Sequence, residues 1–430
     1  MTARVVTALL MLLPACTVRA QDSLSLASLQ ASAVRHDPRG RELELLTEQS
    51  RLRQRNLDAE RRPTLSLQGQ AQYQSGVTTI PITLPGGQSV PIPAHDTYDA
   101  HVAARQPVYD PSLAPRRAVE DAQLAESRAR LRVALFGVQQ GVNDLYFTAL
   151  RTQSQLAELS TTIIDLEAQL HVAGARVKEG AALPSEEMAL RAELLRRRQT
   201  EAELRATCTA TLASLADFTH SPTDSTSVLG IPQLTAQVSA ARSNLADARA
   251  RAEYEQFARA RDVLARQDDA RTAADKPRLS AFGRVGYGRP GLNQLSRNFD
   301  SYYLGGVQLQ WTPFTWGTTS RDREVIALQR QMVSAEEQNF TDNLRRGSTQ
   351  ELAAIDRLAA TLVLDDEIIV LRERIAAETR VRFSEGVLTS AEYVDKDTDV
   401  LSARTARALH RVELAQARAH FLTTLGIEVR

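Results

Sequence analysis

The sequence predicts a mainly α-helical fold with a membrane β-barrel portion, built from two repeats of a β-hairpin followed by a long α-helical hairpin. Three observations predict this fold: an internal duplication, segments of alternating apolar and polar residues in each half, and long stretches with coiled-coil spacing. Charged residues make up 24% of the 430 residues and aromatic residues 5%, a composition typical of long helices. The formal net charge is zero, so no basic bias points to a nucleic-acid partner.

The first 20 residues have the parts of a secretory signal peptide. A charged start and the apolar stretch 5–13 precede a small-residue cleavage site that ends at Ala20. We favour cleavage there, which predicts export from the cytoplasm. A second interpretation takes residues 13–16 as a lipobox and Cys16 as a lipidated first residue.

An internal repeat divides the rest of the chain into halves predicted at 21–219 and 233–430. The segment Arg176-Val-Lys-Glu-Gly180 aligns without gaps on Arg382-Phe-Ser-Glu-Gly386, and the match continues to a shared glutamate six residues further on. Between the halves, residues 220–232 are rich in Ser, Thr, Pro and Asp and are predicted to form the connector.

Each half contains two predicted strands, in which apolar and polar residues alternate with a period of two. The four segments are about 64–75, 97–109, 278–288 and 301–313. In the first, Leu65, Leu67 and Tyr73 share one face and a row of glutamines occupies the other, whereas Phe282 breaks the alternation in the third. Strands of about ten residues with an apolar outer face and a polar inner face suit a membrane barrel around water. Two soluble hairpins with one wet face each are the alternative.

Four strands are too few to close a membrane barrel, because about eight is the smallest number seen. The sequence therefore predicts that several protomers pool their strands.

The long helices are predicted from apolar residues that recur at alternating spacings of three and four. The first runs from Pro111 to about Lys178, which at ~1.5 Å per residue gives a length of roughly 100 Å. The return helices are expected to end near Asp217 and Leu425.

A tight tip is predicted between the two helices of each hairpin. Gly180 and Gly386 end the outgoing helices, while Pro184 and a capping box from Thr389 to Glu392 start the return helices. The tips are therefore expected at about 180–184 and 386–390.

No catalytic residue, cofactor site or metal site is predicted. Gly286-Tyr-Gly288-Arg-Pro-Gly291 has the spacing of a dinucleotide fingerprint, but Pro290 and the polar residues after it offer no helix N-terminus for a pyrophosphate. We interpret this segment as a turn between two strands. The histidines are scattered without metal-ligand spacing, and the triplet 196–198 with its alternating Glu and Arg neighbours is interpreted as a solvated coiled-coil face. Cys208 is interpreted as a small core residue that forms no disulfide.

The signal, the two repeats and the segment Phe383-Ser-Glu-Gly-Val-Leu-Thr-Ser-Ala-Glu-Tyr-Val-Asp395 together resemble the TolC-like outer-membrane efflux protein family (outer membrane factors). The resemblance covers essentially the whole mature chain. It implies a homotrimer with a twelve-stranded β-barrel in the outer membrane on a twelve-helix coiled-coil tunnel in the periplasm. The implied function is a passive exit duct of a tripartite efflux or type I secretion system, with no enzyme activity and no cofactor. The implied partners are a periplasmic adaptor, an inner-membrane transporter and outer-membrane lipid.

The resemblance also implies that the tips contact the adaptor. The matching residues are Gly180, Ala181 and Ala182 in the first tip and Gly386, Val387, Leu388 and Thr389 in the second. The alternative is that the glycines only provide the backbone conformation that ends a helix.

Glu392 and Asp395 match an acidic constriction that attracts cations in the family, and their spacing of three places them on one helix face. The alternative is a solvated helix start where acids complement the helix dipole. Some relatives hold the closed state with a Tyr and an Arg near this tip, where this chain has Phe383 and Leu388.

Two other functions remain open from the sequence. One is a periplasmic coiled-coil scaffold or tether whose strand pairs oligomerise without a pore. The other is a porin-like channel that conducts without an adaptor.

Overall fold

The computed structural model describes residues 24–243 and 251–429, except 80, 82–85, 87–90, 222 and 224–226. The predicted signal peptide 1–20, with Cys16, lies outside the described residues. The described chain is mostly helical, with one four-stranded sheet, and forms two compact units. We call them the sheet unit, from 37–137 and 246–347, and the hairpin unit, from the described parts of 1–36, 138–245 and 348–430. Each unit takes residues from both predicted halves.

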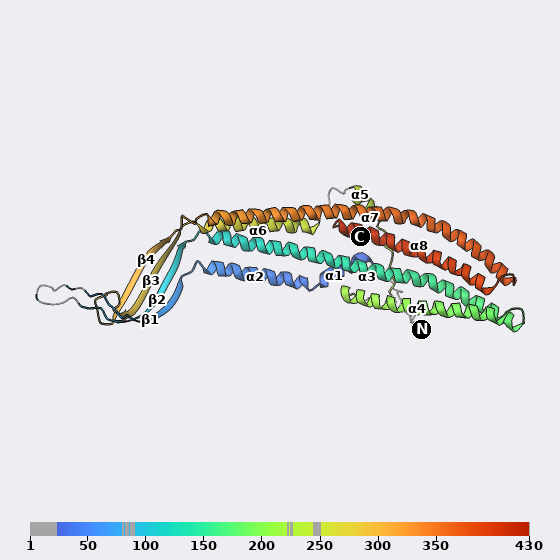
Figure 1. Ribbon diagram of the computed structural model, residues 1–430, viewed down its shortest axis with the longest axis horizontal. Coiled ribbons are helices and arrows are strands. Elements are labelled where there is room, and N and C mark those ends of the chain that lie inside the picture. Colours follow the sequence, from blue (N-terminus) through green and yellow to red (C-terminus); the bar gives the residue numbers. More distant parts are fainter. Residues whose placement is uncertain are drawn as a thin grey trace, which may run out of the picture. The chain divides into compact units, whose positions relative to one another are not determined.

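The sheet unit contains four antiparallel strands in the order β1-β2-β3-β4 (Figure 1). The strands are β1 (Thr64–Tyr73), β2 (Asp96–Tyr109), β3 (Arg278–Arg289) and β4 (Asp300–Gln310). They lie where the alternating segments predicted strands. β4 stops three residues before its predicted end, because Gln310 pairs with Arg278, the first residue of β3, and no partner follows.

The two faces of the sheet differ in polarity, as the alternation predicted. One cross-strand row consists of Leu67, Val102, Val285 and Tyr303, each paired with the next. These side chains are exposed, Leu67 by 81% and Tyr303 by 83%. The adjacent row on the other face is Gln68, His101, Gly286 and Tyr302. The sheet therefore has an uncovered apolar face and a polar face.

Glycines on β3 and β4 make room for larger side chains on the polar face. A Cβ on Gly306 would lie 3.0 Å from Cζ of Phe282, so the aromatic ring that breaks the alternation covers a glycine. A Cβ on Gly286 would lie 2.7 Å from both the His101 Cβ and the Tyr302 Cζ, and one on Gly288 would lie 2.6 Å from the Tyr98 carbonyl oxygen. Gly286 and Gly288 of the dinucleotide-like segment thus allow the strands to pack closely. The element that follows the segment is the strand β4 and not a helix.

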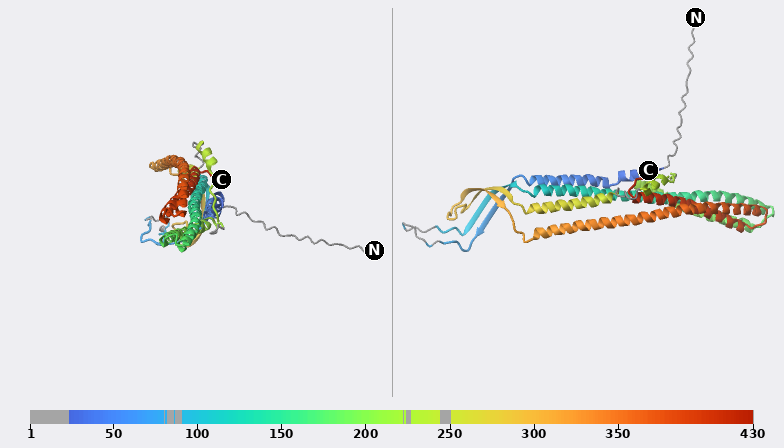
Figure 2. Two further views of the ribbon diagram at one scale, coloured as in Figure 1. Left: turned by 90° about the vertical axis from the view of Figure 1, so that its right-hand side faces the viewer. Right: turned by 90° about the horizontal axis from the view of Figure 1, so that it is seen from above.

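Two helices of the sheet unit were not predicted. α2 (Arg39–Ala59) precedes β1 and runs beside α3 (Leu113–Lys178), and α6 (Ala252–Ala274) precedes β3 and runs beside α7 (Thr318–Ser384) (Figures 1 and 2). Charged pairs join them: Arg117 to Asp58 at 2.9 Å, and Arg323 to Asp268 at 2.7 Å. Because these helices bury few side chains, their apolar periodicity is weak.

The hairpin unit contains the remaining parts of α3 and α7 together with four other helices. These are α1 (Leu26–His36), α4 (Pro184–Thr219), α5 (Thr235–Ser243) and α8 (Ser390–Thr424). α4 contacts α8, α1 packs on α4 and α5 packs on α8. The return helices α4 and α8 end within two residues of the predicted positions, whereas α1 and α5 were not predicted.

The connector between the halves is held by α3. The Tyr146 hydroxyl donates to the Gly230 carbonyl at 2.5 Å, and the burial of the ring raises the pKa of Tyr146 to about 12. Gln153 donates to the Ser227 carbonyl at 2.7 Å and accepts from the Leu229 N–H at 3.1 Å. Leu229 also pairs with Leu24 in a parallel bridge, so α3 fixes both segments.

Cys208 lies on α4 as a buried free thiol, and burial raises its pKa. None of the helices in the described ranges has an uninterrupted apolar stretch long enough to cross a membrane.

Candidate functional site at the hairpin tips

The two tips use the same backbone geometry at aligned positions of the repeat. In the first, Gly180 has φ +70° and the Ala181 N–H donates to the Arg176 carbonyl at 2.8 Å. In the second, Gly386 has φ +78° and the Val387 N–H donates to the Arg382 carbonyl at 2.9 Å. A left-handed residue that closes the last helical turn in this way is favoured as glycine. The tips therefore begin where the sequence predicted.

The restart of the helices differs between the tips. α4 begins at Pro184 without a side-chain cap, while α8 begins after Thr389 with a complete capping box. The Thr389 hydroxyl accepts from the Glu392 N–H at 3.3 Å, and the Glu392 carboxylate accepts from the Thr389 N–H at 3.0 Å. The second tip is consequently the more firmly closed turn.

The predicted tip residues are mostly accessible. Val387 is 69% exposed, Gly180, Ala181, Gly386 and Thr389 are also exposed, and Ala182 and Leu388 are half-buried. Leu183, the last residue of the first tip before α4, is 65% exposed. Each tip thus presents apolar side chains to the surroundings.

The two tips are joined by Arg176 at the end of α3. Its Nη1 donates to the Phe383 carbonyl at 3.0 Å, and its Nη2 lies 3.0 Å from where a Cβ on Gly386 would stand. A second link, between Arg380 on α7 and Asp165 on α3, spans 3.6 Å. Gly386 therefore has two reasons to be glycine: its positive φ and the approach of this guanidinium.

Below the tips lies an apolar core that includes Phe383. Its ring is buried and stacks on Tyr393 of α8 with 5.1 Å between the ring centroids. The surrounding leucines and isoleucine come from α3 and α4. Phe383 is thus a core residue of this unit, and Leu388 is half-buried.

Glu392 and Asp395 are both exposed on α8 near the tip. The pKa of Glu392 is held below its ordinary value, first by the hydrogen bond from the Thr389 N–H and then by that from the Thr389 hydroxyl. The pKa of Asp395 is lowered by Lys396, whose Nζ lies 2.6 Å from Oδ2. Both carboxylates are therefore charged at neutral pH, and each has a local partner.

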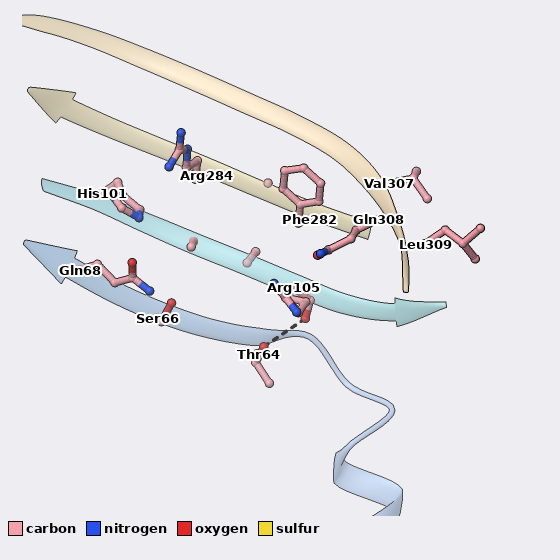
Figure 3. A pocket seen from close by; sticks show the side chains of 13 residues that line it. Thr64, Ser66, Gln68, His101, Arg105, Phe282, Arg284, Val307, Gln308 and Leu309 are labelled. Atoms are coloured by element: carbon pink, nitrogen blue, oxygen red, sulfur yellow. Dashed lines mark hydrogen bonds between the residues drawn. The ribbon is translucent and has the colours of Figure 1, made fainter. Parts of the chain in front are cut away.

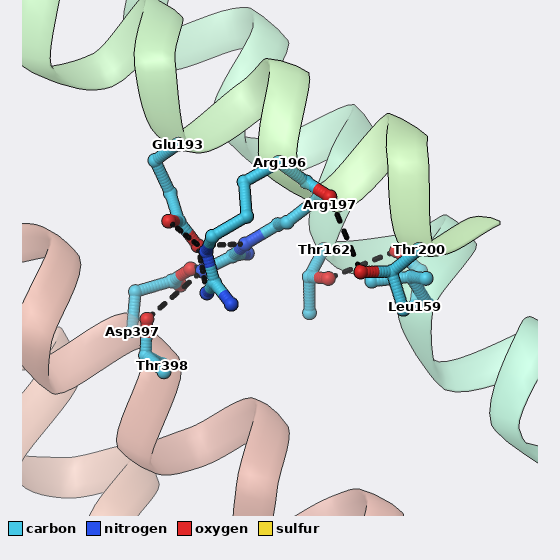
Figure 4. A network of polar contacts seen from close by, with 8 residues as sticks. All are labelled: Leu159, Thr162, Glu193, Arg196, Arg197, Thr200, Asp397 and Thr398. Carbon is cyan, nitrogen blue, oxygen red and sulfur yellow. Dashed lines mark hydrogen bonds and ion pairs between the residues drawn. The ribbon is translucent and has the colours of Figure 1, made fainter. Parts of the chain in front are cut away.

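A buried arginine in this unit was missed by the sequence analysis. The triplet 196–198 was interpreted as a solvated face, which is wrong for Arg197, because only 2% of it is exposed. Its Nε donates to Glu193 at 2.8 Å, and its Nη1 lies 2.8 Å from Asp397 Oδ2, an ion pair not aligned for a hydrogen bond (Figure 4). Its Nη2 donates to the Thr398 hydroxyl at 3.3 Å.

The signal for this burial was present in the helical spacing. Arg197 follows Leu190 and Leu194 at intervals of seven and three, and both leucines are buried. Arg197 is therefore on the core face of α4 and joins α4 to α8.

Comparison with solved structures finds outer-membrane channels along nearly the whole chain. CusC, whose crystal structures concern folding and transmembrane channel formation, is 13% identical, with a TM-score of 0.69 over 94% of this chain and 93% of its own. The open-state MtrE outer-membrane channel of Neisseria gonorrhoeae is 16% identical, with a TM-score of 0.65 over 94% and 89%. VceC, an outer-membrane protein of Vibrio cholerae, is 13% identical, with a TM-score of 0.65 over 94% and 97%.

The chain has the fold of these outer-membrane channels. The resemblance predicted from the repeats and the second tip is thus confirmed for the fold. No protein-family model and no curated protein matches the sequence.

No group of three or more His, Cys, Asp or Glu residues placed to hold a metal ion occurs in the part of the chain that the structure describes. Glu392 is engaged with Thr389, and Asp395 is engaged with Lys396.

Proposed function

We propose that the chain is the outer-membrane exit duct of a tripartite efflux or type I secretion system, a passive channel rather than an enzyme. A periplasmic adaptor and an inner-membrane pump would open it. The observation that carries the proposal is the sheet, whose apolar face is uncovered and whose polar face is continuous across four strands. The channel fold of the solved neighbours supports it.

The sheet also supports a homotrimer. β1 and β4 are its outer strands, so each leaves one edge without a partner strand in the described chain. In lipid, unpaired backbone groups cost several kcal/mol each, so a spanning sheet closes on itself. Three copies would pool twelve strands into one barrel and leave no edge.

The other parts of the chain have matching roles in this proposal. The signal peptide 1–20 would direct export, with cleavage after Ala20 or lipidation at Cys16 as alternatives. The hairpin unit would lie in the periplasm, with the adaptor contacting Gly180, Ala181, Ala182 and residues 386–389. Glu392 and Asp395 would form an acidic ring at the narrow end.

The membrane role of the apolar face is tested by placing one charge on either face of β1. Leu67→Arg is expected to lower the yield of heat-resistant trimers in the outer-membrane fraction strongly, because an arginine facing lipid costs about 2 kcal/mol. Gln68→Arg, on the neighbouring polar face, is the matched control and is expected to assemble normally. If both variants accumulate equally as soluble periplasmic protein, the chain is a scaffold or tether and not a duct.

The acidic ring is tested by Glu392→Gln combined with Asp395→Asn. Glutamine at this position preserves the capping box, so the charge is removed while the helix start is kept. Single-channel recordings of purified trimers are expected to show a loss of cation selectivity or a higher resting conductance. Glu385→Gln, which changes an exposed acid just after the end of α7, is the control. Unchanged traces would remove the gate role, and high conductance of the unmodified protein without an adaptor would favour a porin-like channel.

A further inference from the structure

The polar face of the sheet contains a hollow of about 740 Å³ (Figure 3). Its polar lining comes from all four strands: Thr64, Ser66, Gln68, His101, Arg105, Arg284 and Gln308. None of the lining residues is acidic. The hollow thus combines two guanidinium groups with hydroxyl and amide donors.

The two arginines of the hollow lie close to each other on the same face. Arg284 pairs with Ala103, and Arg105 is two residues further along β2, so the two are diagonal neighbours with Cα atoms roughly 7–8 Å apart. Ala103 between them is small and leaves the space above the strands open. The geometry therefore places two positive charges in the same hollow.

Neither guanidinium has a carboxylate within 4 Å in the described chain. Arg284 lies over the Tyr302 ring, 5.8 Å from its centroid, and its Nε is buried without a hydrogen-bond acceptor. Asp99, an acid on this face, interacts electrostatically with Arg284, but its hydrogen bonds come from His101 Nδ1 at 2.6 Å and from the Tyr302 hydroxyl. By contrast, Arg278 at the start of the same strand lies 3.6 Å from Asp110.

Unpaired like charges on neighbouring strands repel, and a partly buried guanidinium without an acceptor is under-solvated. An oxyanion between them would relieve both costs, because the planar guanidinium fork matches phosphate oxygens in a bidentate manner. The nearby hydroxyl of Ser66 and amides of Gln68 and Gln308 would donate further hydrogen bonds. The apolar face of the sheet, not this one, suits lipid.

We propose that this hollow binds a small soluble oxyanion of the phosphate class. In the proposed duct, this face would line the lumen, so anionic solutes would be retained there on their way out. The retention of solutes in a lumen rests on the proposed function, whereas binding of the oxyanion requires only the sheet.

The test is calorimetric titration of the detergent-solubilised full chain with inorganic pyrophosphate at low ionic strength. The expected result is one saturable site per chain, weakened at least about tenfold by Arg105→Gln or Arg284→Gln and strongly by added salt. Arg284→Lys is expected to recover only part of the affinity, because it keeps the charge without the fork.

The matched control is Arg278→Gln, which removes a positive charge from the same strand but leaves the hollow intact. It is expected to bind as the unmodified chain does. Equal weakening by Arg278→Gln, or no saturable binding by the unmodified chain, overturns the proposal. Because the titration involves no membrane and no current, its failure leaves the duct open to the Leu67 test, and failure of the duct leaves the binding result standing.

Discussion

Replacing Arg197 with alanine is expected to destabilise the hairpin unit by about 3–5 kcal/mol, the range for breaking a buried ion pair by removal of one partner. The loss leaves Asp397, whose side chain is only 14% exposed, without its cation. Glu193 keeps a partner, because Arg196 also binds it at 2.7 Å. Chemical denaturation in detergent, followed by the helical circular dichroism signal, measures the change in the free energy of unfolding.

Arg198→Ala is the matched control for this prediction. Arg198 is the next residue, with a side chain 54% exposed and paired to Glu167 at 2.6 Å, so its loss is expected to cost less than about 1 kcal/mol. The double variant Arg197→Met with Asp397→Leu removes both charges and is expected to recover most of the loss. An equal effect of Arg197→Ala and Arg198→Ala would contradict the buried role of Arg197.

The buried ion pair also bears on the proposed opening of the duct. Arg197 on α4 holds Asp397 on α8, while Arg176 on α3 holds the carbonyl of Phe383 on α7. Both contacts run from one helical hairpin to the other. Any motion that separates the hairpins has to break or rearrange them, so the contact between the two hairpins depends on these arginines.

The parts of the fold that local patterns encode were predictable from the sequence. Period-two alternation located the strands, since Leu65 and Leu67 differ from their neighbours in polarity, and the glycines at 180 and 386 located the tips through a backbone requirement. These signals depend on residues close together in the chain. They do not depend on contacts with distant parts of the chain.

The features that were missed depend on distant partners. α2 and α6 have little apolar periodicity, because charged pairs such as Arg117 with Asp58 join them to the long helices. The roles of Arg176 and Arg197 depend on residues about 200 positions away, Phe383 and Asp397, which no local pattern reveals. Glu392 was predicted to cap α8 from its spacing to Thr389, and its hydrogen bonds confirm this cap, whereas its gate role came from the family resemblance and stays a prediction.

Gly288→Ala is expected to prevent normal pairing of β2 with β3 and to cost about 3 kcal/mol, the upper end of the usual range for overpacking. The added Cβ would lie 2.6 Å from the Tyr98 carbonyl oxygen and 3.2 Å from the Asp99 Cα. Both atoms belong to the backbone of β2, so no side-chain rotation relieves the clash. The measurement is the yield and melting temperature of the proposed heat-resistant trimers.

Gly283→Ala on the same strand is the control, because its Cβ would meet nothing closer than the Leu304 carbonyl oxygen at 3.8 Å, an ordinary contact. This variant is expected to assemble with nearly unchanged stability. Equal tolerance of both substitutions would show that β2 and β3 do not pair in the register of Asp99 with Gly288. The pair of variants thus tests the strand junction between the two halves, on which the continuity of the sheet and the shape of the arginine-lined hollow both depend.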